Sequence, residues 1–170
     1  MNSYKFAFSP LKLWADSLTF LIIFSSLILG TFFSINQPFG IILSLSLLGV
    51  LAISLKKTIR NLYRNLKKQP AIELTEEYFF DHINNIKIYW HNIIKINMIS
   101  PHGNTYVAFI LKDKKKYSEQ LESVLERILF RIPDPDEMAI KTELSLVKGK
   151  NTEIYELINK FHQSKKEFRT

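Results

Sequence analysis

The sequence predicts an α+β protein, in which an N-terminal pair of membrane-spanning helices precedes an antiparallel sheet domain that ends in a C-terminal helix. Residues 17–55 contain no Asp, Glu, Lys, Arg or His and are interrupted once, by a polar turn at 34–38. After residue 70 the apolar residues change from a helical to an alternating spacing, and after residue 151 they return to a helical one. An apolar hairpin and a mixed domain therefore follow one another.

The two halves of the apolar run each have the length of a membrane span. A bilayer core requires about 20 apolar residues per helix, within a range of about 17 to 25. Segments 17–35 and 39–55 meet this requirement. The run is longer than the apolar core of a signal peptide, and no cleavage pattern of small residues follows it. Residues 1–68 are therefore expected to form a transmembrane hairpin with a basic extension.

The positive charge of the chain flanks this hairpin. Of the 23 Lys and Arg residues, residues 1–68 contain eight against one acidic residue, whereas residues 69–170 contain fifteen of each sign. Cytoplasmic flanks of spanning helices carry surplus Lys and Arg. Both termini are therefore expected to face the cytoplasm. A nucleic-acid partner is not expected, because the surplus is not on the folded domain.

Residues 56–68 form a basic segment directly after the second span. Its apolar residues recur at helical spacing, which predicts that it continues the helix into the headgroup region until Gln69 and Pro70 end it. Basic residues near an anionic leaflet are attracted to it. Specific lipid recognition and an ordinary positive flank both fit this pattern. The residues expected to contact the membrane surface are Lys56, Lys57, Arg60, Arg64, Lys67 and Lys68.

The domain at residues 69–170 is expected to fold without the hairpin, around one modest core. Alternating apolar residues bounded by turn residues predict antiparallel strands. Helical spacing predicts a helix at 117–131 and a second one that begins at Asn151 or Thr152. The predicted strands cover residues 71–74, 86–90, 94–98, 105–111 and 138–146.

Trp90 is the most prominent single residue of this domain. Its place in an alternating segment favours a core position, and the alternative is an exposed contact for a partner. The densest charge run of the domain is typical of a solvated loop, but it is also a candidate for contact with a partner or the membrane surface. This run contains Lys112, Lys114, Lys115 and Lys116.

Catalytic and metal-binding chemistry is not expected. The chain has no cysteine and no phosphate-binding glycine loop or nucleophile motif. Its four histidines do not have metal-ligand spacing. An acidic cluster at 134–137 contains prolines and is typical of a turn. We therefore assign no catalytic residue, metal or cofactor.

Three segments carry a resemblance to a known group of proteins. They are residues 70–74, residues 88–96 around Trp90, and residues 153–158. Together with the basic-flanked hairpin, they resemble uncharacterised bacterial inner-membrane proteins with a PH-like cytoplasmic domain. The resemblance implies a multi-pass protein of the cell inner membrane, with a twisted antiparallel sheet closed by a C-terminal helix and no assigned activity. Lipid-binding PH domains carry basic residues where this chain has Glu76 and Glu77, so phosphoinositide binding is not expected.

The leading functional prediction is a membrane-anchored, non-enzymatic binding module. A protein or peptide partner would add to a strand edge or fill a groove beside the closing helix, while anionic lipid is attracted nonspecifically. One alternative is an immunity or regulatory membrane protein that neutralises a toxin or partner. A second alternative is an enzyme whose site the sequence does not reveal.

Overall fold

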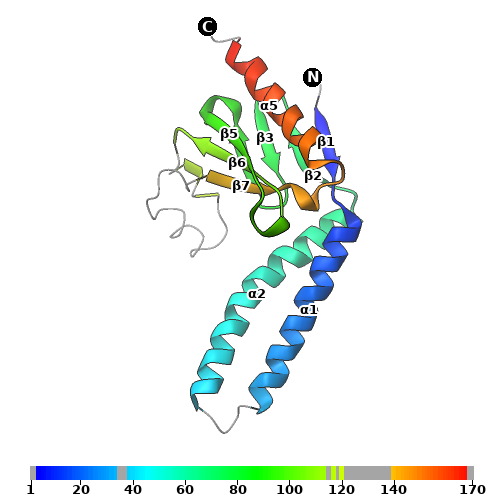
Figure 1. Cartoon of the computed structure of the whole chain (residues 1–170), viewed down its shortest axis with the longest axis vertical. Coiled ribbons are helices and arrows are strands. Elements are labelled where there is room, and N and C mark those ends of the chain that lie inside the picture. Colours follow the sequence, from blue (N-terminus) through cyan, green and yellow to red (C-terminus); the bar gives the residue numbers. More distant parts are fainter. Residues whose placement is uncertain (1–2, 34–37, 114–115, 118, 121–138, 168–170) are drawn as a thin grey trace.

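Two long helices, two antiparallel sheets and a C-terminal helix make up the described part of the fold (Figure 1). A computed structural model describes the chain apart from residues 1–2, 34–37, 114–115, 118, 121–138 and 168–170, and apart from some side chains that lie mainly in the second helix. The predicted α+β class and the antiparallel strands are confirmed.

The long helices lie alongside each other and run in opposite directions (Figure 1). α1 covers Pro10–Phe33 and α2 covers Pro38–Leu66. Proline suits the first helical position, because the N–H that it lacks would have no helical partner there. Within α1, the stretch Pro10–Phe32 is long and apolar enough to cross a membrane, and 6% of its most apolar window is buried inside the protein. It is the one such helix among the described residues, so a hairpin of two spans stays a prediction.

The basic segment continues α2, as predicted, as far as Leu66. Lys68 then adopts a left-handed backbone conformation with φ of 54°. The Gln69 N–H donates to the carbonyl oxygen of Arg64 at 2.9 Å, which satisfies one of the last carbonyl groups of the helix. The chain is thereby turned directly into the first strand after the helix.

The four-stranded sheet has the order β1-β2-β3-β4 and is antiparallel throughout. β1 precedes the long helices and β2 follows them, and Ala7 lies opposite Pro70. The helix pair is therefore an insertion between two neighbouring strands. The predicted domain boundary at residue 69 divides this sheet, and β1 and β3 were not among the predicted strands. The strands are β1 Tyr4–Ala7, β2 Pro70–Leu74, β3 Tyr78–Asp81 and β4 Ile86–Tyr89.

The three-stranded sheet has the order β5-β6-β7. Its strands are β5 Ile93–Ile99, β6 Tyr106–Leu111 and β7 Ala139–Glu143. The C-terminal helix α5 covers Asn151–Glu167 and begins within one or two residues of the predicted start. Short 3₁₀ helices at Trp90–Asn92, Pro101–Gly103 and Leu144–Leu146 connect these elements.

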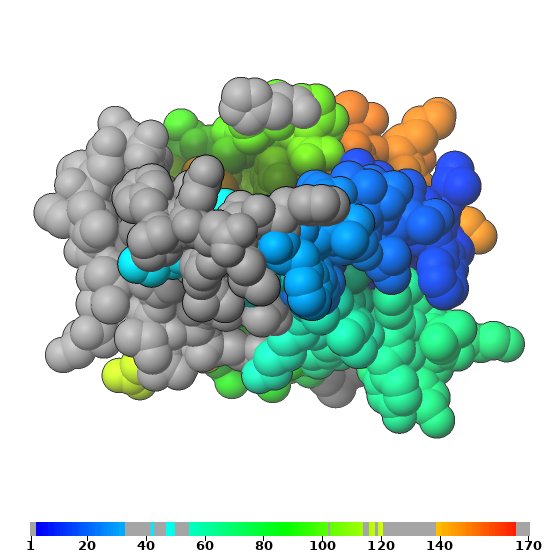
Figure 2. Space-filling view, turned by 90° about the horizontal axis from the view of Figure 1, so that it is seen from below, coloured from blue at the N-terminus to red at the C-terminus, as the bar shows by residue number. Residues whose placement is uncertain are grey.

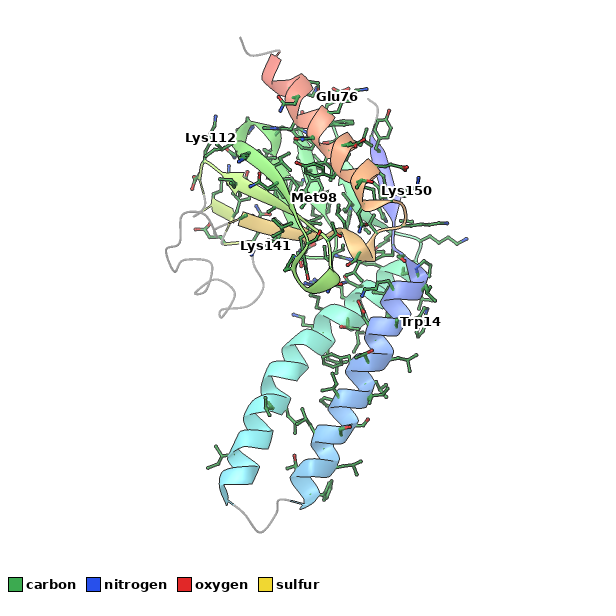
Figure 3. The ribbon with its side chains drawn as sticks, in the orientation of Figure 1. Trp14, Glu76, Met98, Lys112, Lys141 and Lys150 are labelled. Carbon is green, nitrogen blue, oxygen red and sulfur yellow. The ribbon has the colours of Figure 1, made fainter. Side chains whose placement is uncertain are left out.

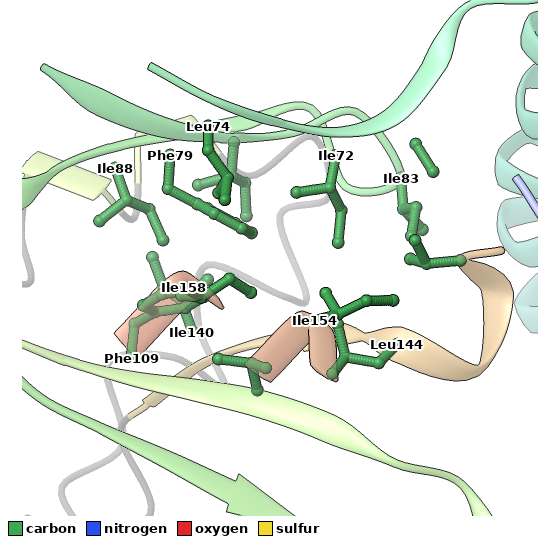
Figure 4. Packing of buried hydrophobic residues seen from close by; sticks show 14 of the residues in the cluster. Ile72, Leu74, Phe79, Ile83, Ile88, Phe109, Ile140, Leu144, Ile154 and Ile158 are labelled. Carbon is green, nitrogen blue, oxygen red and sulfur yellow. The ribbon is translucent and has the colours of Figure 1, made fainter. Parts of the chain in front are cut away.

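The hydrophobic core lies between the two sheets and against α5 (Figure 4). The four-stranded sheet contributes Ile72, Leu74, Phe79 and Ile88, and α5 contributes Ile154 and Ile158. Phe8, directly after β1, and Leu13, in the first turn of α1, are also buried in this core. Because the N-terminal segment supplies core residues, the sheet domain extends beyond the predicted range 69–170.

One predicted core face is correct only in part. The alternation in β5 favoured burial of Ile94, Ile96 and Met98; Ile96 is 6% exposed, as predicted, but Ile94 is 51% exposed and Met98 is 39% exposed. The register shifts between Ile93 and Lys95, and Ile93 is buried in place of Ile94. Such a bulge reverses the faces of the residues that follow it. Most of the predicted helix at 117–131 and the acidic cluster at 134–137 lie outside the described residues.

Candidate functional site

The last turns of α2 dock on the turn between β3 and β4. The guanidinium group of Arg60 donates to the carbonyl oxygen of Ile83 at 2.9 Å. The guanidinium group of Arg64 donates to the carbonyl oxygen of His82 and, at 3.2 Å, to the side-chain oxygen of Asn85. We refer to these contacts between the two arginines and residues 82–85 as the basic junction.

The basic junction gives Arg60 and Arg64 partners within the sheet domain, and their contact with the membrane surface stays a prediction. Residues four apart lie on the same helix face, so both side chains reach the same turn. Charge-assisted bonds to carbonyl groups are stronger than neutral ones, and the planar guanidinium presents several donors at once. The remaining predicted surface cations, Lys56, Lys57, Lys67 and Lys68, are exposed.

A buried carboxylate lies directly behind this turn. Asp81 has no exposed surface and accepts hydrogen bonds from the Thr142 hydroxyl at 2.7 Å and from the backbone N–H of Asn84 at 3.1 Å. The Asn84 side-chain amide donates to Asp81 at 2.7 Å and to the carbonyl oxygen of Lys141 at 3.3 Å. Asp81 and Asn84 therefore connect the β3–β4 turn to β7 in the other sheet.

Burial raises the pKa of Asp81, and the hydrogen bonds from Thr142 and Asn84 oppose this rise in part. The folded protein therefore binds the Asp81 proton more tightly than the unfolded chain does. The stability contributed by protonated Asp81 is fully present below the ordinary pKa of 3.8 and is lost as pH rises through the raised value.

Asp81→Asn tests this pH dependence. We expect the stability of the wild type, relative to the Asn variant, to fall as pH rises from about 4 through the raised pKa of Asp81. Urea unfolding of both proteins in detergent micelles, followed by fluorescence across this pH range, measures the difference. Both proteins contain His82, so its contribution cancels when the two free energies of unfolding are subtracted. Parallel pH profiles would contradict the expectation.

His82 and Glu73 lie on the outer surface of the same sheet. His82 Nε2 is 3.6 Å from one Glu73 carboxylate oxygen, and Lys5 Nζ is 3.4 Å from the other. Burial lowers the pKa of His82, with a smaller lowering from Arg64, while Glu73 raises it. His82 is half-buried, and the Glu73 carboxylate beside it also pairs with Lys5. This arrangement fits a structural role for His82 on this face of the sheet.

Trp90 is a core residue and not a contact for a partner. Its side chain is 4% exposed, and its indole Nε1 donates to the carbonyl oxygen of Thr75 at 2.8 Å. The ring packs against Phe79 and Phe161. The core interpretation of Trp90 is therefore correct and its assignment as a partner contact is wrong.

The predicted lysine run is only partly described. Lys112 is exposed on the side of the sheets remote from the long helices (Figure 3). This position separates it from the basic end of α2. Lys116 Nζ lies 5.8 Å from the centre of the Tyr89 ring. Lys114 and Lys115 lie outside the described residues.

Sequence reasoning missed a group of aromatic residues on the outer face of the four-stranded sheet. The cross-strand pairs Tyr78–Tyr89 and Phe80–Lys87 point away from the core, because their strand neighbours are buried. Lys87 Nζ lies 4.3 Å from the centre of the Tyr78 ring and 5.9 Å from that of Phe80. We call Tyr78, Phe80, Lys87 and Tyr89 the outer cluster. The signal in the sequence was the alternation on both sides of the Asn84–Asn85 turn.

Two strand edges that were candidates for peptide addition already have partners within the chain. Along β5, the Tyr155 hydroxyl donates to the carbonyl oxygen of Ile96 at 3.3 Å, and His162 Nε2 lies 3.3 Å from that of Ile93. Along β4, the Gln120 side-chain amide accepts from the Lys87 N–H at 2.9 Å and donates to its carbonyl at 3.2 Å. A peptide that added to β4 or β5 would have to displace these groups.

Within the part of the chain that the structure describes, no group of three or more His, Cys, Asp or Glu residues is placed to hold a metal ion. Comparison of the chain with models of protein families, with curated proteins and with solved structures gave no match.

Proposed function

We propose that the protein is a membrane-anchored, non-enzymatic binding module that recruits a protein or peptide partner at the cytoplasmic face of a bacterial inner membrane. The apolar, exposed helix α1 supports membrane anchoring. The basic junction supports a fixed connection between the anchor and the sheet domain, since Arg60 and Arg64 bind backbone groups of the β3–β4 turn. A partner bound to the sheet would then be held at a defined place near the membrane.

We further propose that the sheet domain is PH-like and that both long helices span the membrane. Antiparallel sheets of four and three strands with a C-terminal helix agree with what the sequence resemblance implies. The charge-free run that continues from α1 into α2 as far as Leu55 supports two spans. In this arrangement the hairpin is inserted between the first two strands of the PH-like domain.

The topology is tested with single cysteines, because the chain contains none. A cysteine at Asn36, between the long helices, should react with a membrane-impermeant thiol reagent applied to intact cells. A cysteine at Ser164, in α5, should react only after lysis. Full protection of both sites would contradict two spans, and the reverse pattern would contradict cytoplasmic termini.

The outer cluster is the observation that carries the binding function. Aromatic residues, Tyr among them, are enriched at protein interfaces and among the residues that contribute most to binding. Tyr78, Phe80 and Tyr89 are half-buried, so part of each ring stays exposed beside Lys87. These rings form a contiguous surface with a cation, which suits a partner that presents apolar and acidic groups.

Site-specific photocrosslinking in native membranes tests this assignment. A photoreactive benzoylphenylalanine at Tyr89 is expected to give a discrete adduct, whereas the same residue at the exposed Lys141 of the other sheet is the control. Phe80→Ala and Lys87→Ala should each reduce the Tyr89 adduct severalfold. Equal adducts from both positions, or an adduct that neither substitution affects, would reject the outer cluster as the binding surface.

A further inference from the structure

An apolar stripe on α2 is exposed. Ile59, Tyr63 and Leu66 are 55%, 57% and 69% exposed. At 100° per residue these three lie within one narrow arc of the helix, together with the exposed Lys56 and Lys67. We call Ile59, Tyr63 and Leu66 the α2 stripe.

The buried side of the same helix segment is held against the sheets. Asn61 is 3% exposed, Leu62 packs against the core, and Arg60 and Arg64 form the basic junction. Because that side is fixed, the segment cannot rotate to cover the α2 stripe. The exposure of these three apolar side chains is therefore a consequence of the docked geometry.

The start of α1 exposes apolar side chains next to the same region. Leu11 is 84% exposed and Trp14 is 51% exposed, and Trp14 lies at the domain end of the helix pair (Figure 3). α2 slants beneath the sheets so that its last turns approach the start of α1 (Figure 1). Viewed from the hairpin end, both segments are on the surface that faces the viewer (Figure 2).

Helix geometry places the start of α1 and the basic end of α2 at a similar depth relative to the bilayer. Trp14 precedes Phe32 by 18 residues, which is about 27 Å of helix, and a bilayer core is about 30 Å thick. Lys56 follows Phe39 by 17 residues, or about 26 Å. If the connecting turn lies at one boundary of the bilayer core, Trp14 and Lys56 both lie at the other. The α2 stripe then covers about 5 to 15 Å of helix beyond Lys56, and the slant of α2 reduces its distance from the boundary (Figure 1).

The residue types match the headgroup layer. Trp and Tyr are enriched at membrane interfaces, and Lys side chains there extend their ammonium groups toward the phosphates while their stems cover apolar surface. Lys67 Nζ lies 5.6 Å from the centre of the Tyr63 ring, so ring and cation occupy one site. An apolar stripe flanked by lysines is typical of a helix that lies in the interface.

We infer that the α2 stripe, together with Leu11 and Trp14, is buried in the headgroup layer of the cytoplasmic leaflet and, through the basic junction, fixes the orientation of the sheet domain on the membrane. This inference rests on the proposed membrane insertion of the helices. It adds a second, peripheral contact to the anchor and names the residues that make it.

The test uses single cysteines at Leu66 and Ile59 in the full chain, labelled with an environment-sensitive fluorophore. The protein is reconstituted in vesicles of phosphatidylethanolamine and phosphatidylglycerol. At both positions we expect a blue-shifted emission and quenching by a spin label attached near the lipid headgroup. Aqueous iodide should quench these labels only weakly. A cysteine at the exposed Lys160 of α5 is the matched control and should show strong iodide quenching and no lipid quenching.

A cysteine at Leu21, exposed in the middle of α1, separates the two proposals. If the Leu21 label is quenched from within the bilayer but the Leu66 and Ile59 labels respond only to iodide, the stripe inference is wrong and the anchor stands. If the Leu21 label itself responds to iodide, membrane insertion is wrong. Labels on the stripe that neither quencher reaches would indicate protein cover, such as a second copy, and would overturn the inference.

Discussion

Replacing Trp90 with Ala is expected to lower the free energy of unfolding by about 3 to 5 kcal/mol. The ring fills core space 6.4 Å from the Phe79 ring and 6.0 Å from the Phe161 ring, measured between ring centres. Its removal leaves a cavity and also leaves the buried carbonyl oxygen of Thr75 without its donor. Urea unfolding of the purified protein in detergent micelles, monitored by near-ultraviolet circular dichroism, measures the loss.

Two further variants make this result specific. Trp14→Ala removes the same side chain at a 51% exposed position, where we expect a change within about 0.5 kcal/mol. Trp90→Phe keeps much of the ring volume but loses the N–H donor, so its loss should lie between those of the two Ala variants. Equal effects of Trp14→Ala and Trp90→Ala would contradict the core assignment of Trp90.

Phe8→Ala is expected to destabilise the protein to a similar extent, by about 3 to 5 kcal/mol. The Phe8 side chain is 1% exposed, and its backbone forms an isolated bridge with Val147. The adjacent Ser9 N–H donates to the carbonyl oxygen of Leu146 at 2.8 Å. The same unfolding measurement applies, and Lys5→Ala in β1 is the control, because an exposed ion pair contributes about 0 to 1 kcal/mol. Equal losses for both variants would show that β1 has no special role in the core.

The N-terminal segment that contains β1, Phe8 and Leu13 is expected to affect the stability of fragments of the protein. Residues 69–170 alone lack β1, Phe8 and Leu13, which revises the expectation that this range folds independently. A variant in which a short Gly/Ser linker replaces the helix pair and joins residue 9 to residue 69 should unfold at higher urea than the fragment 69–170. The linker can be short, because Ala7 lies opposite Pro70. Equal unfolding midpoints would contradict a stabilising role for β1.

Local periodicity accounts for the elements that the sequence predicted well. The limits of β6 and the start of α5 follow from the spacing of apolar residues and from turn or capping residues within one short segment. The extent of α2 through the basic segment follows in the same way. β1 and β3 were missed because each has only four residues, too few to establish a period.

The candidate surfaces depended on contacts between distant segments. Arg60 and Arg64 belong to the same basic segment as Lys56 and Lys67, yet the arginines bind a turn about twenty residues later in the chain. The outer cluster arises from the register of β3 with β4. Neither the docking of α2 nor this register is encoded in a local pattern. Charge and composition therefore assigned all six cations of the basic segment to the membrane surface alike.

The sequence by itself determined the α+β class, the long apolar helix at the N-terminal end and the positions of most strands, because these depend on hydrophobic spacing over neighbouring residues. The tertiary structure alone decided that β1 joins the sheet across the inserted helix pair, that the Trp90 indole donates to the Thr75 carbonyl oxygen, and that Asp81 lies between the two sheets bonded to Thr142. The physical reason is the same for all three. Each depends on segments about 15 to 70 residues apart, whose approach is set by the packing of the whole core and not by the residues beside them.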